Sequence, residues 1–487
     1  MKHYLACDLG AESGRTILGT LSGDQLHLEE LHRFPNQPVR LPNGLYWDSF
    51  RLLHEIQKGF SIAGCDRKLK LDGIGIDTWG VDFGLLGSDG SLVENPRHYR
   101  DARNHGMLER AWEITTRERI FAQTGIQFMP INSLYQLLSM RLSNAPALSC
   151  AERLLFMPDL FNYWITGVQK SELTIASTSQ FYNPTARQWA VELLEEMKLP
   201  TGILAEIVTP GTCLGCLLSH VAEATGLSAE TRVFATASHD TAAAVAAVPA
   251  SGTDWCYISS GTWSLMGVEL EEPVINDRSL DLNFTNEIGA EGKVRLLKNI
   301  AGLWVLQECR RAWAAEGREY TYDELTQMAA AARPFTAMIP PDRFLDPGRM
   351  PQRIAEWCKA SGQQVPEGAG EMSRAVLEGL ALRYRQVLEN LEPLLNREIK
   401  TIHIVGGGSR NGVLNQFVAD ATRRVVIAGP SEATAAGNVL VQAIGDGSVR
   451  GLAEGRQIIC RSFPVVSFEP KDPDPWDAAY DKFCRLA

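Results

Sequence analysis

One pattern occurs twice in the chain: a short apolar run, a tight turn of small residues, and a second apolar run. The first copy places the turn Asp8–Arg15 between Tyr4–Cys7 and Thr16–Leu18. The second copy places Ser259–Ser264 directly after the apolar run Trp255–Ile258. Each copy predicts a strand, a glycine-containing turn and a second strand. Because each copy opens one half of the chain, the pattern indicates two related domains.

The two turns are candidate phosphate sites. Gly10, Gly14 and their small neighbours leave backbone N–H groups exposed in the first turn, and such a nest attracts phosphate oxygens. Asp8 ends the first predicted strand, where its carboxylate can meet a phosphate-bound Mg²⁺ ion. The alternative is an ordinary hairpin, since glycine turns between strands are common. Two such turns in one chain suggest that both domains hold one polyphosphate.

A third motif, Gly406–Gly408, follows the apolar strand pattern His403–Val405. Apolar residues from Leu414 to Ala421 then recur at helical spacing. Backbone at three glycines can lie flat against a nucleotide base or ribose, because no side chain intervenes. The alternative is a simple strand-to-helix turn. No Gly-Lys-Ser/Thr follows, and the contiguous glycines do not match the spaced dinucleotide fingerprint.

Length and pattern predict a two-domain α/β chain. A chain of 487 residues is too long for a single core. Residues 3–34 are typical of a three-strand meander, residues 104–166 are mainly helical in pattern, and strands elsewhere alternate with helices. Pro249–Gly252 interrupts the pattern just before the second hairpin. We therefore expect one domain over residues 1–248 and another over residues 249–487.

Net charge restricts the class of partner that the protein can bind, and cysteine usage indicates its cellular compartment. The formal net charge of -11 argues against nucleic acid or an anionic membrane as partner, but not against ATP, which needs only local N–H groups and a cation. The first residues do not read as a signal peptide, and no apolar run reaches the ~18 residues of a membrane span. Ten cysteines without framework spacing indicate a reducing cytoplasm. We assign no metal to the single Cys213–Cys216 pair.

Asp240 is the candidate general base. It follows the predicted strand Arg232–Ala237 and opens a helix of small residues, so its carboxylate is placed where α/β proteins bind ligands. The alternative is a helix cap that accepts N–H groups of the first turn. Ser238, His239 and Asp240 do not form a hydrolase triad, because three successive residues cannot relay a proton.

Two other segments are candidate sugar contacts. In the turn Asp77–Asp82, Gly80 allows a hydroxyl to approach the backbone, and Trp79 is either a stacking platform or a core residue. Asn299 is placed at the start of a helix-like run that contains Gln307. Its amide could bind hydroxyls or cap that helix.

Together these motifs resemble the FGGY family of carbohydrate kinases, in the actin-like ATPase superfold. The resemblance runs from residue 4 to about residue 445. It implies an α/β fold of two actin-like, ribonuclease-H-like ATPase domains with a ligand cleft between them. The most specific segments are Ile74–Phe83, Gly125–Phe128, Leu134–Leu137, Met157–Asp159, Ala237–Ala242, Ser259–Gly267 and Leu297–Ile300.

The resemblance also implies residue roles. Asp8 would lie near Mg²⁺, and Asp240 would be the general base. The sugar would meet Gly80, His239, Asp240, Thr241 and Asn299. ATP would meet Ala11, Glu12, Ser13, Gly14, Arg15, Thr262, Gln307 and Gly407.

Two departures from the family pattern are visible. Some relatives carry paired cysteines in the C-terminal domain. Here Ala375 stands where the partner of Cys358 is expected, and Val418 and Thr422 replace a second pair, so no disulfide is expected. Glu12 stands where a small residue is usual and places a negative charge beside the phosphates unless it points to solvent.

The activity implied is ATP-dependent phosphorylation of the C1 hydroxyl of L-rhamnulose, with no obligate protein partner. Asp240 would accept the hydroxyl proton while Mg²⁺ and N–H donors meet the charge on the γ-phosphoryl oxygens. Alternatives are a kinase of another deoxyketose such as L-fuculose, an actin-like nucleotide switch without a small substrate, and a sugar sensor that has lost catalysis.

Overall fold

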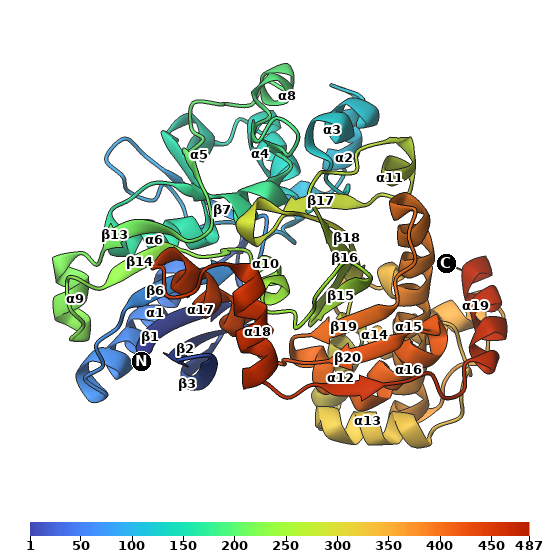
Figure 1. Ribbon diagram of the computed structural model, residues 1–487. Coiled ribbons are helices and arrows are strands. Elements are labelled where there is room, and N and C mark those ends of the chain that lie inside the picture. The colour runs from blue at the N-terminus through green and yellow to red at the C-terminus, as the bar shows by residue number, and fades with distance from the viewer. Residues whose placement is uncertain (487) are drawn as a thin grey trace. The chain divides into compact units, whose positions relative to one another are not determined.

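The chain folds into two compact units, each built from segments that are not contiguous in sequence. The computed structural model describes residues 1–486 (Figure 1). The first unit comprises Met1–Pro249, Glu269–Leu296 and Ala433–Ser462. The second comprises Ala250–Val268, Leu297–Glu432 and the residues from Phe463 onward. The first unit thus ends one residue past the domain boundary that we expected after residue 248. The second domain was expected to be contiguous, but two of its segments, residues 269–296 and 433–462, belong to the first unit.

The first unit is centred on a six-stranded sheet in the order β13-β14-β6-β1-β2-β3. β1 (Lys2–Leu9), β2 (Ser13–Ser22) and β3 (Gln25–Pro35) form an antiparallel meander, which confirms the prediction for residues 3–34. β6 (Gly73–Thr78) runs parallel to β1, and β14 (Arg232–Ala235) runs parallel to β6. The carboxyl ends of these three parallel strands therefore meet at one edge of the sheet.

One face of this sheet carries the main apolar core of the first unit. Leu5 and Cys7 of β1 and Ile74 and Ile76 of β6 alternate onto this face, as the two-residue period of a strand requires. Apolar side chains of α1 (Ser49–Ser61), α6 (Met157–Thr166) and α9 (Ser219–Thr225) join the same core.

The other face packs against helices from distant parts of the sequence. In Figure 1, α17 (Ala433–Gly445) lies beside the blue strands β1 and β2. A Cβ atom added at Gly19 would lie 2.6 Å from Val439, and one at Gly437 would lie 1.8 Å from the carbonyl oxygen of Ala243 on α10 (Asp240–Ala246). These close approaches explain why residues 433–462 belong to the first unit.

A second core in the first unit is formed by residues between 83 and 203 together with Leu280. β7 (Phe83–Leu86) pairs with β8 (Arg153–Phe156), and their side chains pack with those of α4 (Ser133–Leu142). Residues 104–166 are mainly helical, as predicted, with β8 as an interruption.

In the second unit the strand order is β18-β16-β15-β19-β20-β21. β15 (Trp255–Ser260) and β16 (Trp263–Leu270) form the second predicted hairpin, and β15 also pairs in parallel with β19 (Thr401–Val405). The long helix α15 (Gly368–Leu395) packs against α13 (Tyr322–Ala331) and α16 (Gly412–Thr422).

The remaining elements complete the two units. In the first unit they are β4 (Val39–Leu41), β5 (Gly44–Tyr46), the π-helical turn η1 (Ile62–Asp66), η2 (Ala102–Asn104), α2 (Met107–Trp112), α3 (Arg117–Thr124), α5 (Pro146–Ser149), β9 (Ser171–Glu172), α7 (Leu173–Ala176), η3 (Ser177–Ser179), β10 (Tyr182–Asn183), β11 (Gln188–Trp189), α8 (Val191–Glu196), β12 (Ile207–Val208), β13 (Thr212–Cys216), α11 (Asp277–Asp281), β17 (Thr285–Ile288), η4 (Ala290–Gly292) and α18 (Leu452–Ser462). In the second unit they are β18 (Val294–Ala301, which begins in the first unit), α12 (Trp304–Ala315), η5 (Pro341–Arg343), α14 (Met350–Ala360), η6 (Gly407–Arg410), β20 (Val425–Ala428), β21 (Val466–Phe468) and α19 (Asp474–Leu486).

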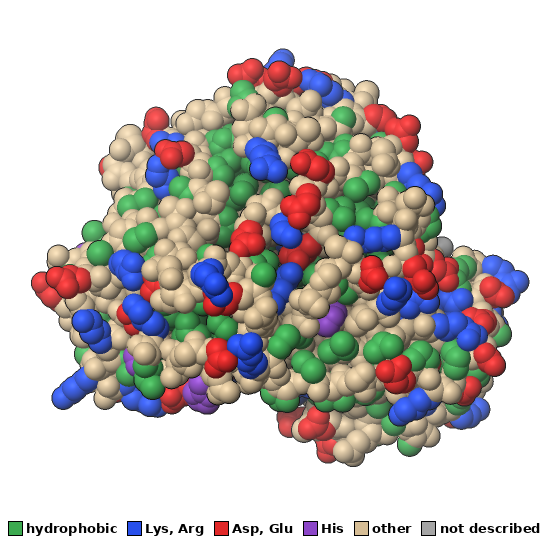
Figure 2. Space-filling model, in the orientation of Figure 1, with side chains coloured by type: hydrophobic (Ala, Val, Ile, Leu, Met, Phe, Trp, Pro, Cys, Tyr) green, Lys and Arg blue, Asp and Glu red, His purple; other side chains and the backbone are tan. Residues whose placement is uncertain are grey.

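The surface carries charges of both signs. Acidic and basic side chains are interspersed over the face shown in Figure 2. Among the described residues, we find no helix with both the length and the apolar character needed to cross a membrane.

Candidate functional site

The carboxyl ends of the parallel strands in the first unit bring three acidic residues to one edge of the sheet. Asp8 near the end of β1 is the register partner of Asp77 near the end of β6. The N–H of Thr78 donates to the carbonyl of Ser238 at 2.9 Å, so the loop that leads to Asp240 continues along β6. The edge position predicted for Asp8 and Asp240 is thus present in the fold.

Asp240 is the first residue of α10, and its carboxylate is accessible. The helix cap is His239, which makes no side-chain capping bond, so Asp240 is not the cap residue. The Asp240 side chain is 30% exposed, and its Oδ1 accepts a hydrogen bond of 3.1 Å from the Thr241 hydroxyl. The part of the side chain that is shielded from water, and next the negative charge of Asp8, raise the pKa of Asp240 to about 7. A carboxyl with such a pKa suits proton exchange near neutral pH.

A buried network holds the loop before Asp240. The carboxylate of Glu172 accepts hydrogen bonds from the N–H of Ser238 at 3.1 Å and from the Thr174 hydroxyl at 2.6 Å. The Thr174 hydroxyl oxygen accepts from the N–H of His239 at 3.1 Å. The backbone on both sides of the Ser238–His239 peptide is therefore fixed, which limits where Asp240 can lie.

Gly80 lies against the histidine that precedes the candidate base. A Cβ atom at Gly80 would lie 3.4 Å from Nε2 of His239 and 3.3 Å from the Thr178 hydroxyl. The next residue, Val81, has a φ of +70°, a strained value for a β-branched side chain. The Val81 carbonyl accepts 2.6 Å from the hydroxyl of Ser133, which helps to hold this conformation. The Gly80 peptide therefore lies beside His239, next to a residue in the left-handed conformation.

Trp79 is a core residue and not an exposed platform. The residue is 5% exposed, and its ring packs 4.1 Å from the ring of Trp47, measured between centroids. Both indole N–H groups donate to Oδ2 of Asp82, at 2.9 Å from Trp79 and 2.6 Å from Trp47. The fully buried Asp82 thus organises the aromatic cluster, and burial raises its pKa to about 6.

The first hairpin turn is closed by its own backbone and by Asn36. The N–H of Gly10 donates to the carbonyl of Ser13 at 2.9 Å, and the Asn36 amide donates to the carbonyl of Gly10 at 2.9 Å. A Cβ at Gly14 would lie 2.3 Å from the ring of Phe34, so packing alone requires glycine there. The side chains of Ala11, Glu12 and Ser13 are partly exposed at this turn.

Arg15 pairs with Asp8 in this structure. The Arg15 guanidinium donates to Oδ2 of Asp8, whose residue is 6% exposed. The two predicted phosphate and metal contacts therefore touch one another.

The electrostatics of this edge fit a divalent cation. Burial, and next the charges of Asp8 and Asp240, raise the pKa of Asp77 well above its usual range, and Oδ1 of Asp77 is buried without a hydrogen-bond partner. Throughout residues 1–486, no group of three or more His, Cys, Asp or Glu side chains forms a metal site.

In the second unit, the second hairpin supports the start of α12. The N–H groups of Leu303 and Trp304 donate to the carbonyls of Gly261 at 3.0 Å and Thr262 at 3.1 Å. Oε1 of Gln307, in the first turn of α12, is buried without a hydrogen-bond partner. Thr262 and Gln307, predicted separately, thus belong to one substructure.

The triple-glycine turn packs on that hairpin. A Cβ at Gly408 would lie 2.0 Å from Oγ of Ser260, and one at Gly406 would lie 3.1 Å from the Ser260 carbonyl. A Cβ at Gly407 would meet nothing within 4 Å. Gly406 and Gly408 are therefore needed for packing, whereas Gly407 faces open space that a nucleotide can occupy.

The position predicted for Asn299 was wrong. It lies on strand β18 and not at a helix start, and α12 begins only at Trp304. The run Leu296–Ile300 satisfies both strand and helix periodicity, and pairing in the sheet decides between them.

Sequence reasoning missed Arg295 and Glu287. Arg295 is fully buried, and its Nη2 lies 3.1 Å from Oε2 of Glu287 and 3.1 Å from Nδ1 of His239. The signal was present: a single arginine between Val294 and Leu296 must find buried partners if that strand is internal.

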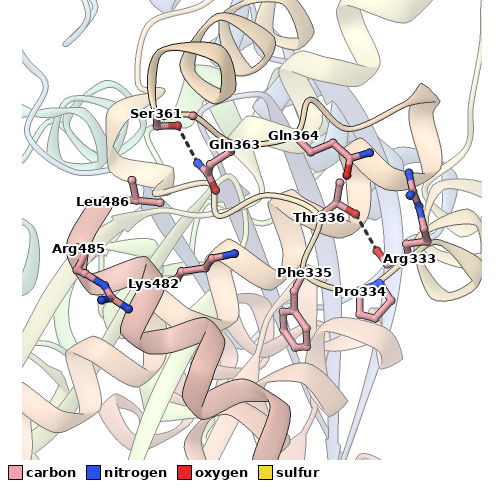
Figure 3. Close-up of a pocket in the computed structure, with 11 residues that line it drawn as sticks. Arg333, Pro334, Phe335, Thr336, Ser361, Gln363, Gln364, Lys482, Arg485 and Leu486 are labelled. Atoms are coloured by element: carbon pink, nitrogen blue, oxygen red, sulfur yellow. Dashed lines mark hydrogen bonds between the residues drawn. The ribbon is translucent and has the colours of Figure 1, made fainter.

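A surface cavity of about 580 Å³ in the second unit contains none of the predicted site residues (Figure 3). Arg333 at its rim already pairs with Glu371 at 2.8 Å, and Gln363 bonds Ser361 at 2.9 Å. It is lined by Arg333, Pro334, Phe335, Thr336, Ser361, Gly362, Gln363, Gln364, Lys482, Arg485 and Leu486.

All ten cysteines, which fall within residues 1–486, are free thiols, including Cys213, Cys216 and Cys358.

Comparison with known proteins gives one consistent result. The profile of the N-terminal domain of the FGGY family of carbohydrate kinases matches residues 3–247, and that of its C-terminal domain matches residues 256–445. A rhamnulokinase of Bacteroides thetaiotaomicron is 47% identical over 484 residues, 99% of each chain. A rhamnulokinase of Bacillus subtilis is 37% identical over 97% of this chain and 96% of its own.

Solved structures share the fold at low identity. A ligand-bound xylulose kinase from Lactobacillus acidophilus superposes with a TM-score of 0.82 at 16% identity, covering 100% of this chain and 98% of its own. Glycerol kinase from Plasmodium falciparum with ADP gives 0.78 at 14% identity, covering 100% and 98%.

Proposed function

The chain belongs to the FGGY family of carbohydrate kinases, and from that premise we propose that it transfers the γ-phosphoryl group of ATP to the C1 hydroxyl of L-rhamnulose. The products are L-rhamnulose 1-phosphate and ADP. The observation that carries the mechanism is the partly exposed carboxylate of Asp240, at the sheet edge beside His239 and Gly80. The full-length similarity to proteins named rhamnulokinase supports this sugar over L-fuculose.

Asp240 acts as the general base. Its carboxylate accepts the proton of the C1 hydroxyl as the hydroxyl oxygen bonds to the γ-phosphorus and the bond to the β-phosphate oxygen breaks. The raised pKa of Asp240 means that it takes the proton readily near neutral pH. The fixed loop behind it, held by Glu172 and Thr174, keeps the carboxylate in place without movement at the moment of transfer.

We propose that the sugar is held by four residues besides the base: His239, Thr241, Gly80 and Asn299. His239 and Thr241 flank Asp240, so their polar atoms are placed to bind the hydroxyls next to C1. Asn299 belongs to the second unit, and its proposed contact rests on the resemblance of Leu297–Ile300 to the family motif.

The nucleotide contacts are proposed on two turns. The first is Ala11–Arg15, whose Arg15 would exchange Asp8 for phosphate oxygens. The second comprises Thr262, Gln307 and Gly407, which share one substructure. Asp8 would hold Mg²⁺, which when bound neutralises the β- and γ-phosphate charge. We place the reaction in the cytoplasm, where free thiols stay reduced.

Phosphorus NMR of the product tests this proposal. C1 of a 2-ketose is a primary carbon, so a phosphate on it couples to two equivalent or near-equivalent protons and gives a triplet-like signal. A phosphate on a secondary hydroxyl couples to one proton and gives a doublet. We expect the triplet with L-rhamnulose and ATP; a doublet, or no phosphate ester, would contradict the proposal.

A further inference from the structure

The two nitrogens of the His239 ring meet different surroundings, all within the first unit. Nδ1 lies 3.1 Å from Nη2 of Arg295 and 3.5 Å from Oε2 of Glu287. Nε2 lies 3.4 Å from Oδ1 of Asp240 and, on the same side, 3.4 Å from the position a Cβ of Gly80 would take. One nitrogen therefore faces a buried ion pair, and the other faces the proposed sugar site.

Hydrogen-bond chemistry decides which nitrogen carries the proton. A guanidinium has donors and no acceptor, so the nitrogen that it contacts must present a lone pair. Nδ1 lies closer to Arg295, at 3.1 Å, than to Glu287, at 3.5 Å, which favours an unprotonated Nδ1. The proton of a neutral ring then sits on Nε2.

The position of Arg295 is built by its hairpin. Its stem passes Gly289, where a Cβ would lie 3.2 Å from Cγ of Arg295. Its Nε donates to the carbonyl of Ile288 at 3.3 Å, and the Ile288 N–H donates to the Ser177 hydroxyl at 2.9 Å. The side chain is fully buried and paired with Glu287, so it cannot swing away from His239 without leaving a buried charge unpaired.

We propose that Arg295 is a positioning residue that holds His239 in the Nε2–H tautomer, so that His239 donates a hydrogen bond to a substrate oxygen and leaves proton acceptance to Asp240. This inference rests on the proposed function for its substrate, but the tautomer itself does not. With the opposite tautomer, Nε2 would carry a lone pair beside the Asp240 carboxylate. Both groups would then be acceptors facing the sugar, and either could take the proton of the C1 hydroxyl.

The electrostatics agree with this arrangement. Burial, and next the positive charge of Arg295, lower the pKa of His239 well below its usual range, so the ring stays neutral. The charged groups facing the ring are Asp240 at Nε2 and Arg295 and Glu287 at Nδ1. Glu287 balances Arg295, and without Arg295 the Glu287 carboxylate would attract a proton to Nδ1.

Nitrogen NMR of the wild-type protein with ¹⁵N-labelled histidine tests the tautomer without any substrate. The His239 signals are assigned by their loss in His239→Asn. We expect the Nδ1 shift of an unprotonated nitrogen and a proton on Nε2, unchanged from pH 6 to pH 8. A proton on Nδ1, or a cationic ring at pH 7, would overturn the proposal. This result stands whether or not L-rhamnulose proves to be the substrate.

Steady-state kinetics test whether the contact between Arg295 and His239 affects turnover of the ketose. The variants are Arg295→Met, Arg295→Lys and Arg456→Met. Arg456 also pairs with a glutamate of the first unit, Glu269, at 2.7 Å, and the two side chains are 13% and 7% exposed. Arg456→Met is therefore the matched control for loss of a largely shielded ion pair. We expect Arg295→Met to lower kcat/KM for the ketose by about 10–100-fold, by analogy with lost hydrogen-bond partners behind metal-bound histidines. Arg295→Lys, which keeps a cationic donor, should recover part of that loss.

The pattern of losses separates positioning from folding. We expect Arg295→Met to raise KM for the ketose more than KM for ATP, and to move the His239 proton to Nδ1 in the NMR spectrum. Arg456→Met should do neither. Equal losses in both methionine variants, with the Nε2 proton retained in Arg295→Met, would overturn the proposal. If Arg295→Met does not fold, the wild-type NMR result decides.

Discussion

The amide of Asn438 donates a hydrogen bond of 2.5 Å to Oδ2 of Asp77, although 361 residues separate the two in sequence. Both residues are fully buried, and the Asn438 amide also donates to the carbonyl of Gly75 at 3.2 Å. This contact ties α17 to β6 directly below the edge that carries Asp8 and Asp240. The late segment 433–462 thus helps to build the edge that carries the candidate base.

We expect Asn438→Ala to lower the free energy of unfolding by about 1–3 kcal/mol, because it leaves a buried carboxyl oxygen without its donor. Urea denaturation followed by circular dichroism measures this. Asn43→Ala, at an exposed position, is the control and should stay within about 0.5 kcal/mol of wild type. An Asn438→Ala value as small as the control would mean that the pair does not stabilise the unit.

Replacing Asp240 by asparagine should lower kcat by about 10²–10⁴-fold and leave the dissociation constant of the sugar nearly unchanged. Asparagine keeps the size of the side chain and its acceptor for Thr241, but it cannot take a proton. Steady-state kinetics and calorimetric sugar binding measure the two quantities. A variant that retains more than a tenth of wild-type turnover would show that Asp240 is structural.

The pH dependence of wild-type kcat/KM should report the same group. The base must be deprotonated to act, and its pKa is raised to about 7. Activity should therefore fall as pH decreases below about 7 and level off above it. A flat profile between pH 5.5 and pH 8 would contradict the assignment of Asp240 as the base.

Asp82→Asn should change stability in a pH-dependent way. The folded pKa of Asp82 is about 6, above the value in an unfolded chain, so unfolding releases a proton between pH 4 and pH 6 and the wild-type carboxyl loses stability as pH rises through that window. Asparagine has no such loss. The stability of Asp82→Asn relative to wild type should rise by about 3 kcal/mol from pH 4 to pH 7.

Thermal or urea unfolding at several pH values measures this difference. Asp89→Asn is the control of opposite sign, since hydrogen bonds from Ser91 lower the pKa of the exposed Asp89. Its relative stability should fall, not rise, as pH increases. The same sign in both variants would contradict the proposed role of burial at Asp82.

Neighbouring glycines in the Gly406–Gly408 turn offer a matched pair. Gly407→Ala should fold as wild type, because its Cβ meets open space, but should weaken ATP binding if a nucleotide lies there; we expect about 10-fold, or ~1.4 kcal/mol. Gly408→Ala should instead cost about 1–3 kcal/mol of stability through overlap with Ser260. Calorimetry and urea unfolding on both variants test this. Unchanged ATP affinity in Gly407→Ala would remove Gly407 from the nucleotide site.

Much of the fold followed from local patterns. Alternating apolar residues and glycine turns predict both hairpins, and the positions of Asp8 and Asp240 after apolar runs predict carboxylates at the carboxyl ends of strands. These inferences need only short-range periodicity and one topological rule.

Long-range pairing explains what the sequence did not predict. Nothing local indicates that Arg295 meets His239 across 56 residues, or that Asn438 meets Asp77. The same limit hides the return of residues 269–296 and 433–462 to the first unit. Asn299 was expected at the start of a helix because the short segment Leu296–Ile300 fits either a strand or a helix. Pairing with the neighbouring strands of the sheet makes this segment part of a strand.

ADP release measured with L-rhamnulose, L-fuculose, L-xylulose and no sugar tests the central claim most directly. We expect ADP to form rapidly only with a ketose present, with the highest kcat/KM for L-rhamnulose, and we expect Asp240→Asn to abolish most of this release. ADP release equally fast without sugar would contradict a sugar kinase, and a higher kcat/KM for L-fuculose would contradict the proposed substrate.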